Sequence, residues 1–256
     1  FSIHSYLRKG ALDNYDTIFC VGNFHEKEIR ETENTYNLKP KKLIQYGFGR
    51  LDTLLQEKHK FPQIGIDKKT VIIAPSYGKN NLLEVCGIEL LDILLESNFS
   101  VLLRPHYRIF KDSKNLIETI RERFENNSNF ILEEGIIPAE KFHSSLCMIS
   151  DWSGISFEYA FTFEQEVIFI DVPKKILNKD FGEISSEPIE ISLRHKIGHV
   201  VLPEDIKKIP KIISDMNKNN LISEKIKKIR SETVFNIGES SKIGADVIEK
   251  ICLEKN

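Results

Sequence analysis

The sequence predicts an α/β protein in which helices flank a parallel β-sheet. Short apolar runs alternate with longer stretches whose apolar residues recur with helical spacing. Several of the runs, such as Val167 to Ile170, contain only Val, Ile or Phe and do not alternate with polar residues. This pattern is typical of parallel strands that are buried on both faces.

Each predicted strand is an apolar run that ends at Gly, Pro, Asn or charged residues. In chain order the predicted strands are 17–21, 43–46, 70–75, 99–104, 129–133, 146–150, 167–171 and 199–202. Helical periodicity between the runs predicts helices at 26–35, 82–97, 113–126, 139–143 and 153–163. Residues 203–256 are rich in Lys and Glu, and we expect them to form helices that close the domain.

The best candidate for a domain border lies between Leu55 and Lys69, where a polar segment with Pro and Gly interrupts the periodicity. Residues 69–256 are expected to form one domain. Residues 1–60 are too short for a domain with a full sheet of its own. We interpret them as the end of a domain whose beginning lies upstream.

Composition excludes several classes of protein. The 36 Lys+Arg and 38 Asp+Glu residues give a formal net charge of −2, which argues against a nucleic-acid binder. No apolar run approaches the roughly 18 to 20 residues of a membrane-spanning helix. The four cysteines are far apart and form no C-x-x-C pair, which suits a reducing compartment, so a cytoplasmic location is expected.

The sequence also lacks a Walker lysine loop, an H-E-x-x-H motif and an aspartate cluster, so neither a metal nor a cofactor is expected.

Two candidate site segments follow predicted strands. Arg104 and His106 flank Pro105, which ends the strand, and they could meet a phosphate at the rim of the sheet. An arginine paired with a surface carboxylate beside a turn histidine is the alternative. Ser76 follows another strand at what should be the same rim, in a turn that allows close approach of a ligand.

The segment from Ser150 to Glu158 contains a third strand end and the start of a helix. Free backbone N–H groups at a helix N-terminus attract anions, and the hydroxyl of Ser153 could add a donor next to Gly154. Glu158 lies about one turn into the helix, where its carboxylate could accept hydrogen bonds from a ribose diol. The alternative is an ordinary helix cap by Asp151 or Ser153 with a solvated Glu158.

Gly238 to Lys242 opens the last predicted helix. Ser240 and Ser241 could hold a phosphate there, although a serine at this position is more often only a cap.

In order along the chain, these segments resemble a known family. The residues are G-F-G-R-L-D at 47–52, A-P-S at 74–76, R-P-H at 104–106, S-D-W-S-G at 150–154 and G-E-S-S at 238–241. The set is similar to that of the CDP-glycerol glycerophosphotransferase family, which comprises teichoic-acid and capsule polymerases of GT-B architecture. The resemblance implies a Rossmann-like C-terminal domain, residues 69–256, that binds the nucleotide donor. It also implies that residues 1–60 are the end of an N-terminal domain on the acceptor side.

The resemblance also implies a reaction and residue roles. An acceptor hydroxyl would attack the phosphorus that bears glycerol in CDP-glycerol, and CMP would leave. Arg104 and His106 would face the diphosphate as catalytic groups, and His4 would be the base. Glu158 would bind the ribose of the nucleotide donor. The other contacts to the nucleotide donor would come from Ser76, Asp151, Ser153, Gly154, Ser240 and Ser241. Helix dipoles and basic side chains would stand in for a metal, so activity is expected to be independent of metal.

Departures from the family pattern leave the donor and the base open. Gly49, Trp152 and Gly154 stand where the family usually has Pro, Tyr and Ser. A GT-B glycosyltransferase using a nucleotide sugar, or an enzyme like the UDP-sugar epimerases, is therefore an alternative, as is a non-catalytic nucleotide-binding domain.

The expected partners are a CDP-activated polyol or nucleotide-sugar donor and a lipid-linked or polysaccharide acceptor, without nucleic acid. A lipid-linked acceptor is compatible with peripheral association at the cytoplasmic face of the membrane.

Overall fold

The computed structural model describes residues 1–60, 69–135, 139–216 and 221–254. The chain divides into two compact units. Unit 1 comprises residues 1–57, 175–193 and 227–256, and unit 2 comprises residues 58–174 and 194–226. The predicted border between Leu55 and Lys69 falls largely on residues outside the described part of the chain and stays a prediction.

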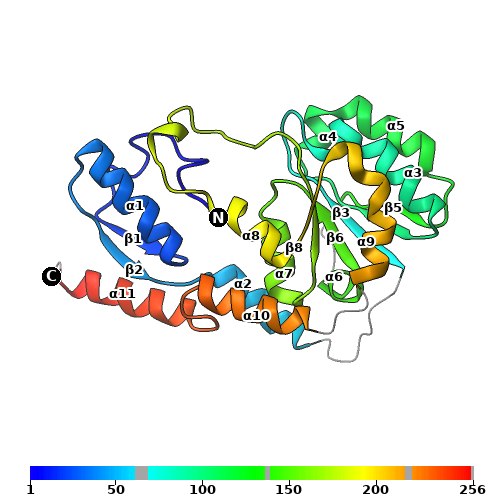
Figure 1. Cartoon of the computed structure of the whole chain (residues 1–256). Helices are drawn as coiled ribbons and strands as arrows, with labels where there is room; N and C mark the ends of the chain where they lie inside the picture. Colours follow the sequence, from blue (N-terminus) through cyan, green and yellow to red (C-terminus); the bar gives the residue numbers. More distant parts are fainter. Residues whose placement is uncertain (61–68, 136–138, 217–220, 255–256) are drawn as a thin grey trace. The chain divides into compact units, whose positions relative to one another are not determined.

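Unit 2 contains a parallel sheet of six strands with the order β5-β4-β3-β6-β7-β8. The strands, labelled in Figure 1, are β3 (Thr70–Ala74), β4 (Ser100–Leu103), β5 (Phe130–Leu132), β6 (Cys147–Ser150), β7 (Val167–Ile170) and β8 (Gly198–Val201). The chain builds outward from β3 to β5 and then returns to place β6 on the other side of β3. Strand order thus reverses between β3 and β6, and open α/β sheets bind ligands at such a switch point.

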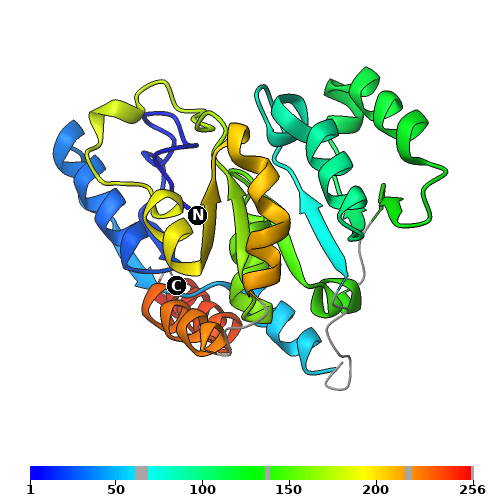
Figure 2. The same cartoon turned by 45° about the vertical axis from the view of Figure 1, so that its right-hand side comes forward.

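Helices cover the two faces of this sheet because successive side chains of each strand point to opposite sides. Val71 and Ile73 of β3 belong to a buried cluster built with α3 (Ile88–Glu96), α5 (Lys114–Phe124) and α9 (Ile209–Met216). In the turned view of Figure 2, α9 lies across the strands. The opposite face packs against α7 (Ile155–Phe163), where the rings of Phe157 and Phe169 are 6.0 Å apart.

Shorter elements complete unit 2. They are a π-helical turn (Leu83–Gly87) before α3, α4 (Ile109–Asp112), α6 (Ala139–Ser144) and a 3₁₀ turn (Pro203–Lys208). Two of the borders between the units fall inside α8 (Ile189–Ile197) and α10 (Ile222–Thr233). In the described residues, no helix has both the length and the apolar character needed to cross a bilayer.

In its described residues, unit 1 contains a parallel pair of strands, the helices α1 (Asn23–Tyr36), α2 (Gly49–Lys58) and α11 (Ser240–Glu254), and parts of α8 and α10. The strand β1 (Thr17–Cys20) pairs along its whole length with β2 (Lys42–Gln45). The last residue of α2 belongs to unit 2. A 3₁₀ turn (Phe181–Glu183) lies in the middle segment, 175–193.

The structure confirms the predicted α/β class with a parallel sheet, and each predicted strand is present within a residue at either end. Among the described residues, three α-helices were not predicted: α2, α4 and α8. α2 begins at Gly49, inside the G-F-G-R-L-D segment at 47–52. α8 runs directly into β8 with no loop, so Ile197 and Gly198 mark the junction of the two elements.

Gly198 is required by the close approach of β7 to the start of β8. A Cβ atom at this position would lie 1.8 Å from the carbonyl oxygen of Val167, which is backbone and cannot rotate away. A Cβ atom added to Gly182 would have no other atom within 4 Å, so a substitution at Gly182 provides a matched control.

We therefore predict that Gly198→Ala lowers the free energy of unfolding by about 2 kcal/mol or more, because strand β8 must shift to relieve the clash. Gly182→Ala should change it by less than about 0.5 kcal/mol. Urea denaturation of both variants measures the difference. Equal stability of the two variants would show that the β7–β8 pairing is wrong.

Candidate functional site

Three loops meet at the carboxyl edge of the unit 2 sheet. They follow β3, β4 and β6, which are neighbouring parallel strands, so the loops begin side by side. Ser76 lies in the first loop, Arg104 and His106 in the second, and Ser153 and Gly154 in the third. The structure thus brings together strand ends that are far apart in the sequence, as the sequence predicted.

The carboxylate of Asp151 joins the loop after β6 to the loop after β3. Its Oδ1 accepts the backbone N–H of Ser76 at 2.7 Å, and its Oδ2 accepts the N–H of Leu82 at 3.0 Å. Asp151 is 1% exposed. Nearby, the hydroxyl of Ser150 donates to the carbonyl of Ala74 at 2.6 Å. The Asp151 carboxylate therefore fixes the loop in which Ser76 lies.

His106 joins the loop after β4 to the same loop after β3. Its ring lies 4.5 Å from the ring of Tyr77 and 4.5 Å from that of Tyr107, measured between centroids. The backbone N–H of Arg108 donates to its Nδ1 at 3.2 Å, so the neutral ring carries its proton on Nε2. The guanidinium of Arg108 lies 4.6 Å from the centroid of Tyr77. His106 thus stands between two aromatic rings, with Nε2 as a donor.

Arg104 continues the edge of β4. Its backbone N–H donates to the carbonyl of Ile73 at 2.8 Å, which extends the pairing of β3 and β4 by one residue. The residue is half-buried, as is His106, whereas Pro105 between them is buried. Two cationic or donor side chains therefore emerge at the rim of the sheet, where a phosphate could accept from both.

The loop after β6 leads into α7, which begins at Ile155. The carbonyl of Ser153 accepts the N–H of Ser156 at 3.2 Å and its hydroxyl at 2.6 Å, so Ser153 starts the first turn. Gly154 is exposed, and a Cβ there would meet no atom within 4 Å. Glu158 lies on the first turn of α7 and is half-buried. This arrangement can receive an anion at the N–H groups of α7.

His4, the base implied by the resemblance, lies in unit 1 beside a buried carboxylate. Its Nδ1 is 2.9 Å from Oε2 of Glu28, and its ring stacks on Phe181 with centroids 5.0 Å apart. Glu28 also accepts the backbone N–H of Ile3 and of His4 at 2.6 and 3.1 Å. Burial alone would raise the pKa of Glu28, but the hydrogen bonds from His4 and Ile3 outweigh it and lower the pKa. A carboxylate that holds the ring of a histidine is a common way to orient a catalytic base.

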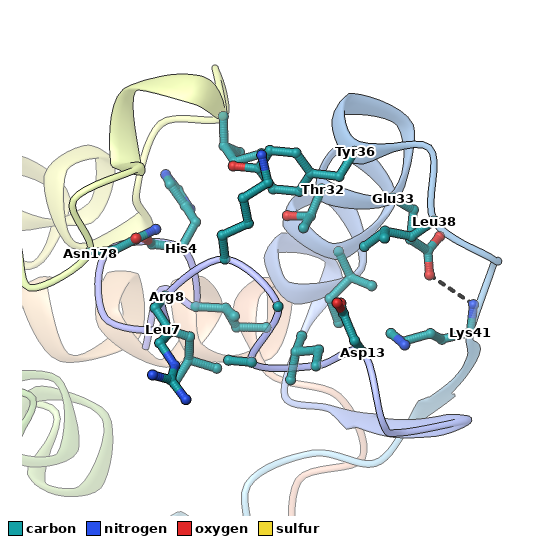
Figure 3. Close-up of a pocket in the computed structure, with 17 residues that line it drawn as sticks. His4, Leu7, Arg8, Asp13, Thr32, Glu33, Tyr36, Leu38, Lys41 and Asn178 are labelled. Atoms are coloured by element: carbon teal, nitrogen blue, oxygen red, sulfur yellow. Dashed lines mark hydrogen bonds between the residues drawn. The ribbon is translucent and has the colours of Figure 1, made fainter.

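A pocket in unit 1 adjoins His4 (Figure 3). His4 and Asn178 lie at one end of it, and Tyr36 and Lys41 lie at the other. The side chain of Asn178 donates to the carbonyl of His4 at 2.9 Å, and the ammonium of Lys9 lies 3.8 Å from the centroid of Tyr36. The lining thus combines hydroxyl, amide and cationic groups with an imidazole and with the carboxylates of Asp13 and Glu33.

Ser240 and Ser241 begin α11 in unit 1. Ser240 is fully buried, and its backbone N–H donates to Oδ2 of Asp52 at 3.0 Å, while Gly238 donates to Oδ1 at 2.7 Å. Asp52 therefore already binds this helix N-terminus. Ser241 is exposed. The expected donor contacts of Ser240 and Ser241 stay predictions.

The candidate residues thus divide between the units. Unit 2 holds Ser76, Arg104, His106, Asp151, Ser153, Gly154 and Glu158, and unit 1 holds His4, Ser240 and Ser241. Sequence reasoning missed Tyr77 and Glu28. A tyrosine after a strand and a glutamate in a charged helix give no local signal of the contacts that they make in the fold.

Comparison with solved structures shows the fold. The chain is similar to a variant of the wall teichoic acid polymerase TagF, with a TM-score of 0.58, 17% identity, and coverage of 96% of this chain and 60% of that chain. It is also similar to UDP-GlcNAc 2-epimerase from Neisseria meningitidis bound to UDP-GlcNAc, with a TM-score of 0.58, 15% identity, and coverage of 92% and 62%. These neighbours are GT-B fold proteins. The chain spans about 60% of the length of these structures.

Comparison with protein families gives a more specific result. No curated protein matches the sequence. Residues 6–170 match the family described as CDP-glycerol:poly(glycerophosphate) glycerophosphotransferase. The matched range contains the loops after β3, β4 and β6, and it leaves out His4, Ser240 and Ser241. Because the match covers well over half of the sequence, the chain belongs to the CDP-glycerol:poly(glycerophosphate) glycerophosphotransferase family.

Proposed function

We propose that the protein transfers glycerol phosphate from CDP-glycerol to a hydroxyl acceptor during synthesis of a teichoic-acid or capsule-type polymer. The observation that carries the proposal is the meeting of three loops at the β3–β6 switch point. There Arg104 and His106 stand at one strand end and the N-terminus of α7 follows another. Such an edge suits a nucleotide diphosphate, because it supplies donors and positive charge at the usual ligand position of an open sheet.

In the proposed reaction, an acceptor oxygen attacks the phosphorus that bears glycerol, and the bond from that phosphorus to the bridging oxygen of CMP breaks. The acceptor proton passes to a base, and CMP leaves with the negative charge. Because charge grows on the bridging and equatorial oxygens, donors placed in advance lower the barrier. Arg104 supplies a permanent cation and His106 supplies its Nε2 proton. The amides and hydroxyl at Ser153 and Gly154 bind the second phosphate.

Other residues of unit 2 bind or support the nucleotide in this proposal. Glu158 accepts hydrogen bonds from the ribose, and Ser76 contacts the donor from the loop after β3. Asp151 is negatively charged and accepts two backbone N–H groups, so we assign it the task of holding that loop. A carboxylate in direct contact with a diphosphate would repel it.

His4 is the proposed base. Glu28 holds its ring through Nδ1, which directs Nε2 to the acceptor and stabilises the imidazolium that forms when the proton is taken. The pocket beside His4 supports this role, because its hydroxyl, amide and carboxylate groups can bind the hydroxyls of an acceptor and its cationic groups can bind phosphates. The acceptor itself is proposed to be lipid-linked or a polysaccharide. The reaction is proposed to take place in the cytoplasm or at the cytoplasmic face of the membrane.

A nucleotide sugar is the second candidate donor, because the fold neighbours include epimerases solved with UDP-GlcNAc. Calorimetric titration with CDP-glycerol, CDP-ribitol and UDP-GlcNAc separates the candidates. Preference for CDP-glycerol supports the proposal, and preference for UDP-GlcNAc contradicts it. Tight binding with no CMP release in the presence of an acceptor would indicate a non-catalytic nucleotide-binding domain.

For His106→Ala, we predict that turnover falls by about 10²- to 10⁴-fold, or roughly 3 to 5 kcal/mol in barrier, while donor affinity changes much less. The lost Nε2 donor acts mainly on charge that develops in the transition state. CMP release measures turnover, and thermal unfolding checks that the half-buried residue is not needed for folding.

Arg104→Ala should weaken donor binding as well, because a guanidinium contacts phosphate already in the ground state.

Near-normal turnover of His106→Ala would exclude His106 from the reaction. Loss of activity together with a large drop in melting temperature would assign His106 a structural role between Tyr77 and Tyr107.

For His4→Ala, we predict a loss of kcat of about 10²- to 10⁴-fold with an unchanged dissociation constant for CDP-glycerol, because a base acts on the acceptor. Glu28→Gln keeps the size of the side chain and removes its charge, so kcat should fall by about 10-fold or more. Glu122→Gln, an exposed residue of α5, is the control and should behave like the unsubstituted protein. Full activity of Glu28→Gln would disprove the orienting role.

A further inference from the structure

A buried arginine lies beside the turn that starts α7. Arg194 of α8 is 3% exposed, and its guanidinium carbon lies 4.1 Å from the centroid of the Trp152 ring. Its Nη1 donates to Oδ1 of Asp171 at 2.8 Å, and its Nη2 donates to the carbonyl of Ile170 at 3.2 Å. The guanidinium therefore connects the carboxyl end of β7 to the residue that precedes Ser153.

The indole of Trp152 is held from two directions. Its Nε1–H donates to the carbonyl of Val172 at 2.8 Å, and Arg194 covers one face of the ring. The ring of Phe169, which is fully buried, also packs against the guanidinium of Arg194, with 5.1 Å between the guanidinium carbon and the ring centroid. Asp151, next in the chain, is held by two hydrogen bonds to the loop after β3. The turn that leads to Ser153 is thus fixed on both sides.

Burying a guanidinium costs free energy, because the charged group loses its hydration. Burial lowers the pKa of Arg194, against the hydrogen bond and charge of Asp171 and the charge of Asp151, which raise it. The side chain of Arg194 is 4% exposed and that of Asp171 is 39% exposed, so the desolvation cost of this ion pair falls mainly on the arginine. Arginine is suited to such a task, because its rigid fork can stack on an aromatic ring and donate in the plane at the same time.

We propose that Arg194 is a positioning residue for the donor site. By fixing the indole of Trp152, it fixes the Ser153–Gly154 start of α7, where the diphosphate of the donor binds. The inference rests on the proposed function, because it takes that diphosphate as the ligand of the turn. It extends the site to α8, beyond the residues 6–170 that match the family.

The test uses the natural fluorescence of Trp152, since it is the single tryptophan of the chain. Arg194→Lys keeps the charge and loses the flat fork. Arg123→Lys is the matched control, because Arg123 also donates to an aspartate through two nitrogens, at 3.2 and 2.8 Å, and lies over a phenylalanine ring at 5.6 Å. Its side chain, however, is 54% exposed and belongs to α5.

Three readouts are taken on each purified variant. Acrylamide quenching of the ligand-free protein measures how firmly the indole is held, calorimetry with CDP-glycerol measures donor affinity, and the rate of CMP release gives kcat and the KM for donor. Arg194→Lys should increase quenching and raise the dissociation constant by about 10-fold or more, with a larger effect on the KM for donor than on kcat. Arg123→Lys should leave all three readouts unchanged.

The outcomes separate this inference from the proposed function. Unchanged donor affinity in Arg194→Lys, with or without a change in quenching, overturns the positioning role alone. Failure of the unsubstituted protein to bind CDP-glycerol overturns the proposed function, and the positioning role with it. If Arg194→Lys does not fold, Trp152→Phe takes its place in calorimetry. Weaker donor binding supports the inference, and unchanged binding overturns it.

Discussion

The loops of the candidate site depend on one carboxylate, that of Asp151. It follows β6 directly and accepts backbone N–H groups of Ser76 and Leu82, which lie 75 and 69 residues earlier in the chain. Loss of the carboxylate would leave two buried N–H groups without an acceptor, each at a cost of about 1 to 3 kcal/mol. The same interaction decides where Ser76 lies and how the chain enters α7. The shape of the switch point is therefore set before any ligand binds.

Buried carboxylates play the same part in unit 1. Asp52 accepts N–H groups at the start of α11, and Glu28 accepts those of Ile3 and His4. In each case, a buried acidic side chain fixes a backbone segment through two hydrogen bonds. In the proposed function, these three carboxylates hold the backbone, whereas Arg104, His106 and the amides of α7 bind the phosphates of the donor.

The sequence predicted the sheet well because buried parallel strands leave a local signal. The run Val167 to Ile170 has no polar residue, and Pro105 marks the end of β4. Once the strands are parallel neighbours, their carboxyl ends must lie at one edge, so Arg104 and Ser153 could be placed together without a structure.

Pairings over long separations could not be predicted in this way. Nothing near Arg194 in the sequence points to Trp152, because the contact arises only when α8 returns the chain to β8. Nor does α1 reveal that Glu28 is buried against His4. The helix α2 was missed for a local reason, since Gly47 and Gly49 lower helix propensity and favour a turn. Tertiary contacts, including the binding of Asp52 to the start of α11, offset that preference.

Binding of the nucleotide donor at the β3–β6 switch point of unit 2 can be tested by NMR, from the amide chemical shifts recorded during titration with CDP-glycerol. We expect the largest shifts in unit 2 at Ser76, at Arg104 to Arg108 and at Asp151 to Glu158. Shifts confined to unit 1, or to the ends of β5 and β8, would contradict it.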